Sequence, residues 1–204
     1  MPPAPITISA AVEGPTDEAV LRRVLEHLGA SLGPVYGKHG KPALLEHLSG
    51  YNHAAQHGPW IVLVDLDQAA DCAPPARAQS LPAPSPPHQC VRLAGRKVES
   101  WLLADREALA AFLRVTIAHI PSQPEALPDP KDAMVNLARR SRRRDIRLDM
   151  VPRPESGRSE GPAYTSRLIE YAQSGWRPEV AAQHAESLQR LCRRVTAYMK
   201  EANG

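Results

Sequence analysis

Trp60-Ile-Val-Leu-Val-Asp65-Leu-Asp67 is an apolar run that ends in two aspartates one residue apart. A short apolar run closed by polar residues predicts a strand buried on both faces, and such strands belong mainly to parallel sheets covered by helices. Ligands of open α/β sheets bind beyond the carboxyl ends of the strands. Two acids at a buried strand end concentrate negative charge, which a divalent cation offsets. Aspartate oxygens suit Mg²⁺ or Mn²⁺, so Asp65 and Asp67 predict a metal site.

An earlier strand is also expected to end in an acid. Residues 5–12 place apolar side chains at alternate positions, and this pattern stops at Glu13-Gly-Pro-Thr-Asp17, which predicts a strand, a tight turn and a helix start. Thr16 is expected to cap this helix, which ends at Gly29. Glu13 therefore occupies the same topological place as Asp65. Asp17, in the first helical turn, either faces that place or simply favours the helix dipole.

Length and composition set the class of protein. The 204 residues suffice for one domain with an appended helical part, and the formal net charge is +3. The three cysteines include no Cys-x-x-Cys pair, which argues against a disulfide framework or a zinc ribbon and favours a reducing cytoplasm. No window approaches the ~18 apolar residues of a membrane span, and the first residues do not read as a signal peptide. The sequence leaves the oligomeric state open.

The later part of the chain adds a third candidate acid. A proline-rich stretch over residues 71–89 predicts a long surface loop. The short strand expected at Cys90-Val-Arg-Leu-Ala94 is followed by Glu99 near the carboxyl edge of the sheet, although Glu99 is also a reasonable partner for Arg96 or Lys97. Helices are expected from there on, the last being one long helix from Pro178, with His184 and Cys192 on its apolar stripe.

A basic cluster follows the helix that Lys131 is expected to open. Six arginines lie within residues 139–147, five of them Arg139, Arg140, Arg142, Arg143 and Arg144. Crowded like charges repel one another unless an anion answers them, and phosphate backbones are the usual answer. The alternative is a solvated helix end, where the dipole also favours positive charge. Aromatic residues make up only 4% of the chain, so we expect contacts with the nucleic-acid backbone rather than with bases.

Together, the Glu13-Gly-x-x-Asp17 turn, the strand-terminal Asp65-x-Asp67, the later Glu99 and the basic helix resemble the TOPRIM fold of topoisomerases, primases and OLD-family nucleases. The resemblance implies a Rossmann-like, mostly parallel α/β core over residues 1–118, with a helical C-terminal extension over residues 119–204 packed on it. It also implies that Glu13, Asp17, Asp65, Asp67 and Glu99 bind two metal ions and that Lys131 lies beside the scissile phosphate. The pattern Glu99-Ser-Trp101-Leu-Leu-Ala-Asp105 is similar to that of TOPRIM-like bacterial proteins encoded beside AAA or ABC ATPases and associated with phage defence.

By this resemblance we expect a metal-dependent nuclease, in which two cations stabilise charge on the attacking and leaving oxygens of a phosphodiester. Two alternatives remain open. A haloacid-dehalogenase-like phosphatase also uses Asp-x-Asp after a buried strand, with the first aspartate as nucleophile, but leaves Glu13 without a role. A catalytically silent TOPRIM-shaped subunit would bind nucleic acid or an ATPase without cutting.

Overall fold

The computed structural model describes residues 6–65, 89–94 and 98–203, with side chains over 6–65 and 98–201. Asp67, Arg96 and Lys97 lie outside these residues, as do Cys72 and the predicted loop except for its last residue, Gln89. The strands are β1 (Thr7–Val12), β2 (Ser31–Gly37), β3 (Trp60–Asp65) and β4 (Gln89–Ala94). The first helices are α1 (Pro15–His27), α2 (Lys41–Glu46) and α3 (Leu48–Ala54). The later ones are α5 (Glu99–Ala104), α6 (Arg106–Leu113), α7 (Pro130–Arg139), α8 (Arg144–Met150), α9 (Tyr164–Ser174), α10 (Pro178–Ala181) and α11 (Glu186–Asn203), with short 3₁₀ turns at Ile117–His119 and Pro124–Ala126.

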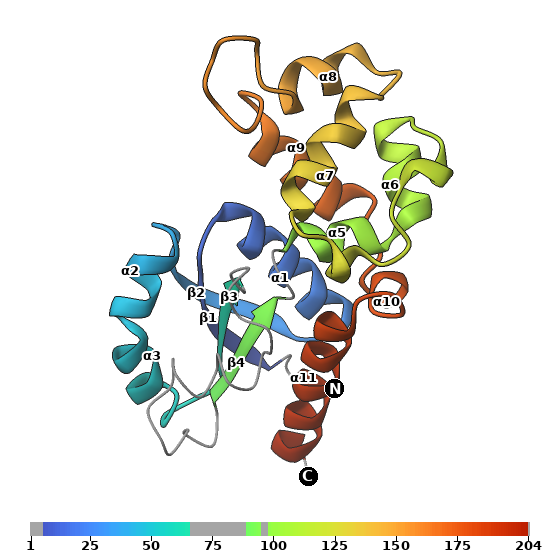
Figure 1. The fold of residues 1–204 in the computed structure, drawn as a ribbon. Coiled ribbons are helices and arrows are strands. Elements are labelled where there is room, and N and C mark those ends of the chain that lie inside the picture. The colour runs from blue at the N-terminus through green and yellow to red at the C-terminus, as the bar shows by residue number, and fades with distance from the viewer. Residues whose placement is uncertain (1–5, 66–88, 95–97, 204) are drawn as a thin grey trace.

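The four described strands form one parallel sheet in the order β2-β1-β3-β4 (Figure 1). Ala10 of β1 pairs with Ile61 of β3, so the strands that end before Glu13 and at Asp65 are direct neighbours that run in the same direction. This confirms the predicted α/β class and the predicted pairing of these strands. It brings both strand ends to one edge of the sheet.

Helices cover both faces of the sheet, because successive side chains of a strand point to opposite sides. On one face Ala10, Val12, Ile61 and Leu63 belong to a large core that includes α1. On the other face Ala11, Val62 and Val64 pack with Leu44 of α2 and Leu48 of α3. Figure 1 shows α2 and α3 on one side of the strands and α1 on the other. β3 therefore presents apolar side chains to both faces, as its unbroken apolar run predicts. β1, which was expected from alternating apolar residues, is also buried on both faces.

The C-terminal helices share the core of the α/β part. Side chains of α5, α7, α9 and α11 belong to the same buried cluster as those of β1 and α1, α1 packs along α9, and α11 packs beside β4. Trp101 and Trp176 lie at its centre, where the indole N–H of Trp101 donates to Ser187 Oγ at 2.7 Å and that of Trp176 to the Trp101 carbonyl at 3.1 Å. Within the described part of the chain, no helix combines the length and the apolar character needed to cross a bilayer.

The structure corrects two local predictions and adds one strand that the sequence pattern did not predict. The helix after β1 begins at Pro15 with Gly14 at the N-cap position, so Thr16 lies inside the first turn and does not cap it. The sequence pattern did not predict β2, an edge strand that contains Pro34. The long helix expected from Pro178 is two helices, and His184, expected in the core, is exposed between them. Ser187 explains this break, because its N–H and hydroxyl are bound by Glu125 and fix the start of α11.

Candidate metal and phosphate site

Glu13 and Asp65 meet at the carboxyl edge of the sheet. Glu13 follows β1 directly, and its Oε1 accepts a hydrogen bond from the backbone N–H of Asp65 at 2.8 Å. Lys41, at the start of α2, donates from Nζ to the Asp65 carbonyl at 2.8 Å. Gly37 ends β2 beside Val12 with a φ of +86°, and a Cβ there would overlap the Val12 carbonyl oxygen. Three neighbouring strand ends are therefore fixed around the two acids.

Asp17 is turned back toward the same edge by the first turn of α1. Its Oδ2 accepts the Gly14 N–H at 2.7 Å, and only 6% of the residue is exposed. Burial raises the pKa of Asp17 to about 7, the negative charges of Glu99 and Glu13 add to the rise, and the Gly14 hydrogen bond opposes it. Both readings of Asp17 thus have a physical basis, since it caps the helix and also lies within the field of two other acids.

Glu99 reaches the site from the first residue of α5. It is 8% exposed, and its Oε1 accepts a hydrogen bond from the hydroxyl of Tyr164, at the start of α9, at 3.3 Å. Burial, followed by the charge of Glu99 and the hydrogen bond to it, raises the pKa of Tyr164 well above its usual range. Tyr164 therefore stays protonated and acts as a donor that holds Glu99 in place.

One pocket of about 250 Å³ is lined by Asp17, Asp65, Glu99 and Tyr164, whereas Glu13 and Lys41 lie outside its lining. The acids Asp17, Asp65, Glu99 and Glu160 form its walls together with Lys131, Tyr164 and residues of the α1 turn, which are Gly14, Pro15 and Thr16; Val98 and Thr165 complete it. Lys131 forms an ion pair with Glu160, and its Nζ lies 5.5 Å from the centre of the Tyr164 ring. The pocket joins five segments that are far apart in sequence.

Sequence reasoning placed Asp17, Asp65, Glu99 and Lys131 in the site but missed Lys41, Glu160, Tyr164 and Thr165. Glu160 and Tyr164 lie at the end of a loop rich in glycine and proline, where residue spacing carries no signal for a site. The loop returns to the pocket because the Gly161 N–H donates to the Met150 carbonyl at 3.0 Å and the Ala163 N–H to the Asp149 carbonyl at 2.9 Å. Only the tertiary structure shows that Glu160 and Tyr164 line the pocket.

The donor set of the pocket is made of carboxylate oxygens, which suit a hard divalent cation. As the described side chains lie, no three His, Cys, Asp or Glu residues are grouped closely enough to hold a metal ion. Oxygens of three acids are engaged by the chain itself: Glu13 by Asp65 N–H, Asp17 by Gly14 N–H and Glu99 by Tyr164. Metal binding by three of these acids therefore requires their side chains to move closer together than they lie in this structure. Asp67, the fifth predicted ligand, lies outside the described residues.

No family model, curated protein or solved structure matches this chain.

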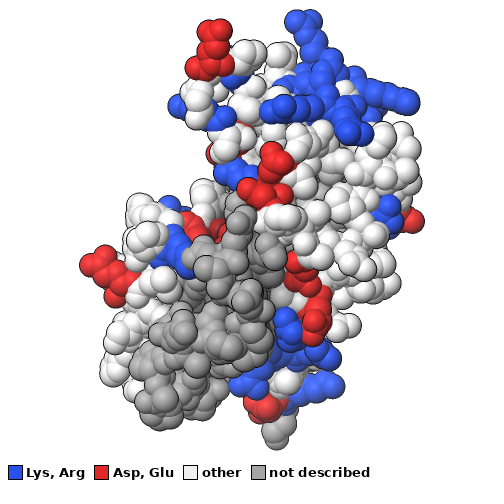
Figure 2. All heavy atoms as spheres, in the orientation of Figure 1, with Lys and Arg blue, Asp and Glu red and all other residues white. Residues whose placement is uncertain are grey.

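The basic cluster lies at the far end of the helical part, where α7 ends and α8 begins. Arg139, Arg140, Arg142 and Arg144 are exposed there, and Figure 2 shows Lys and Arg side chains gathered over this turn. Arg114 joins them from the end of α6, since its carbonyl accepts the Arg142 N–H at 3.4 Å. Sequence reasoning missed Arg114, which is distant from the cluster along the chain.

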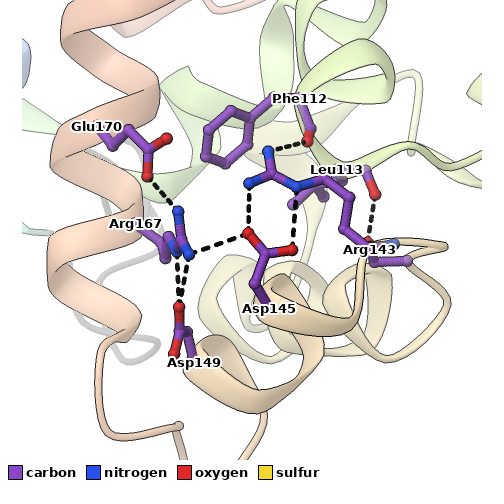
Figure 3. A network of polar contacts seen from close by, with 8 residues as sticks. Phe112, Leu113, Arg143, Asp145, Asp149, Arg167 and Glu170 are labelled. Atoms are coloured by element: carbon purple, nitrogen blue, oxygen red, sulfur yellow. Dashed lines mark hydrogen bonds and ion pairs between the residues drawn. The ribbon is translucent and has the colours of Figure 1, made fainter.

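Arg143 has more contacts within the protein than its neighbours, of which Arg140 contacts His119 Nδ1 at 3.2 Å and Arg147 donates to the Ser141 carbonyl. Arg143 donates to both carboxylate oxygens of Asp145, through Nε at 3.2 Å and through Nη2, and lies 5.7 Å from the centre of the Phe112 ring. Figure 3 shows the network continuing from Asp145 to Arg167, which also pairs with Asp149 and Glu170. Arg143 therefore helps join α8 to α6 and α9, while the exposed arginines around it keep their charge at the surface.

Proposed function

We propose that this protein is a metal-dependent nucleic-acid phosphodiesterase of the TOPRIM/OLD-like kind. The observation that carries the proposal is the convergence of Asp17, Asp65 and Glu99 with Lys131 in one pocket at the carboxyl edge of a parallel sheet. Glu13 supports it, because its carboxylate lies against the backbone of Asp65. The raised pKa of Asp17 also supports it, since a bound cation would offset the negative charge that burial makes costly.

Each group has a task in this proposal. Glu13, Asp17, Asp65 and Glu99, with Asp67, would hold Mg²⁺ or Mn²⁺, which when bound would activate water and offset charge on the phosphate. Tyr164 orients Glu99 through its hydroxyl. Lys131 faces the same pocket and would lie against a phosphate oxygen, where a fixed positive charge favours the transition state.

The exposed arginines at the α7–α8 turn would hold a nucleic-acid backbone outside the pocket. The cluster is compatible with any sequence, because phosphates carry no sequence information directly. An AAA or ABC ATPase partner and a part in phage defence are further proposals that rest on the resemblance alone.

The decisive experiment combines metal binding with cleavage. Asp65→Asn and Asp17→Asn are each expected to weaken Mn²⁺ binding in calorimetry at least about tenfold and to abolish Mn²⁺-dependent cleavage of DNA or RNA, because each removes a charged oxygen donor. The matched control is Glu26→Gln, which changes an exposed acid of the same helix as Asp17 and should alter neither readout.

Three outcomes would contradict the proposal. Wild-type cleavage that continues undiminished in EDTA excludes the metal dependence. Accumulation of an aspartyl-phosphate at Asp65 favours the phosphatase alternative. Nucleic-acid binding with neither Mn²⁺ binding nor cleavage identifies a non-catalytic binding subunit.

A further inference from the structure

A second pocket lies directly beside the carboxylate pocket. It encloses about 420 Å³ and is lined by the loop Gly157, Arg158, Ser159, Glu160, Gly161 and Pro162, with Tyr164 and Thr165 at the start of α9. Glu160, Tyr164 and Thr165 line both pockets. The two cavities therefore lie next to each other at the start of α9.

The two pockets differ in the chemistry of their lining residues. The first pocket is lined by the acids Asp17, Asp65 and Glu99, and the ion pair between Lys131 and Glu160 lies at the boundary. The second pocket adds Arg158 and Ser159 to the lining, and Thr165 lines both pockets. Thr165 lies in the first turn of α9, where backbone N–H groups have no partner within the helix. Cationic and hydroxyl donors of this kind bind phosphate oxygens.

The loop that carries Arg158 is tied to the protein on its C-terminal side. The Gly161 N–H donates to the Met150 carbonyl, and a Cβ at Gly161 would overlap the Asp149 carbonyl oxygen, so the loop backbone lies directly against the end of α8. Glu160, directly before Gly161 in the loop, is bound to α7 through its ion pair with Lys131. Arg158 is thus held within two residues of an anchored position.

We infer that the second pocket, centred on Arg158, binds the phosphate adjacent to the one that reacts. This inference rests on the proposed function and adds a substrate class to it: the substrate is a nucleic-acid strand that extends past the reacting phosphodiester, with one phosphate at the carboxylates and the next at Arg158, Ser159 and Thr165. A single phosphodiester fills only the first pocket.

The test compares two substrates on Arg158→Ala. The first is bis(p-nitrophenyl) phosphate, which has one phosphodiester, and the second is a short single-stranded oligonucleotide, both with Mn²⁺. The oligonucleotide KM is expected to rise about tenfold, because a hydrogen bond to a charged group is lost, while hydrolysis of the small ester stays unchanged. The control is Arg153→Ala, an exposed arginine of the same loop that lines neither pocket.

Equal losses on both substrates, an unchanged oligonucleotide KM, or an equal effect of Arg153→Ala would each overturn the inference. If the wild type hydrolyses neither substrate, the proposed function fails, and fluorescence anisotropy of the labelled oligonucleotide still tests the subsite. In that measurement Arg158→Ala must weaken binding relative to Arg153→Ala, and equal affinities would exclude a phosphate site at Arg158.

Discussion

At Asp17, effects that favour the protonated carboxyl oppose one that favours the charged carboxylate. It is nearly buried, it accepts the Gly14 N–H, and it lies in the field of Glu99 and Glu13. Its pKa is raised from 3.8 to about 7, mainly by burial. The metal-free folded state therefore holds the Asp17 proton more tightly than the unfolded chain does, so the stabilisation from this proton is complete below pH 4 and is lost as the pH rises to about 7.

We predict that Asp17→Asn removes this pH dependence. One pKa unit corresponds to about 1.4 kcal/mol, so the free energy of unfolding of the variant relative to wild type should rise by roughly 4 kcal/mol at most between pH ~4 and pH ~7. Urea denaturation of both proteins in EDTA across this range measures the difference. A difference that stays constant with pH would mean that Asp17 ionises normally in the folded protein.

The end of β2 is tightly constrained beside the site. Gly37 has a φ of +86° and lies against the carbonyl of Val12. Val12 is the residue that directly precedes Glu13. An L-residue with a side chain is disfavoured at this φ, and the lack of space adds to the cost. The close approach of β2 to β1 therefore depends on glycine, and with it the position of Glu13.

Gly37→Ala is expected to lower the free energy of unfolding by about 2 kcal/mol or more. The contrasting control is Gly50→Ala within α3, where a Cβ meets nothing within 4 Å and where alanine should stabilise by about 0.5–1 kcal/mol. Thermal and urea unfolding of the two variants give the comparison. Changes of the same sign and size in both would show that β2 can separate from β1 without cost.

The elements also show what sequence can and cannot predict. β3 is predictable because a strand buried on both faces leaves an unbroken apolar run, and β1 because apolar side chains alternate along it. The convergence of Glu13 with Asp65 follows from the parallel pairing of these strands. β2 was missed because Gly33 and Pro34 weaken its strand pattern, which an edge strand tolerates. The break before α11 was missed because Ala181 to Ala185 contain no helix-breaking residue, and the cause lies in the distant Glu125. Glu160 and Tyr164 reach the site only through the packing of the C-terminal helices.

The acids of the pocket and the exposed arginines of the basic cluster lie at opposite ends of α7. The acids lie at the sheet edge, and the arginines lie at the α7–α8 turn (Figure 2). α7 connects the two, with Lys131 near its first residue and Arg139 at its last. A nucleic acid that contacts both would be held by the arginines and cut at the acids.

Replacing Arg139, Arg140 and Arg144 by alanine should flatten the dependence of DNA affinity on salt. Each lost phosphate contact lowers the slope of log affinity against log salt by about 0.9 on duplex DNA, so three contacts lower it by up to ~2.7. The charge-matched control replaces Arg190, Arg193 and Lys200 of α11, which are exposed on another element. Equal slopes for both triple variants would assign the cluster to a solvated helix end. Arg143 is kept in every variant, because its loss would disturb the network with Asp145.

The packing of α1 against α9 has a consequence for synthesis on the ribosome. α1 buries Val20, Leu21, Val24 and Leu25 in a core that also contains Leu168 and Tyr171 of α9. The N-terminal half leaves the ribosome first. The apolar side chains of α1 that pack against α9 then stay exposed until residues 164–174 have been made. Chains that stall between these two helices should be prone to aggregation and should require chaperones, because the sheet alone cannot bury that face.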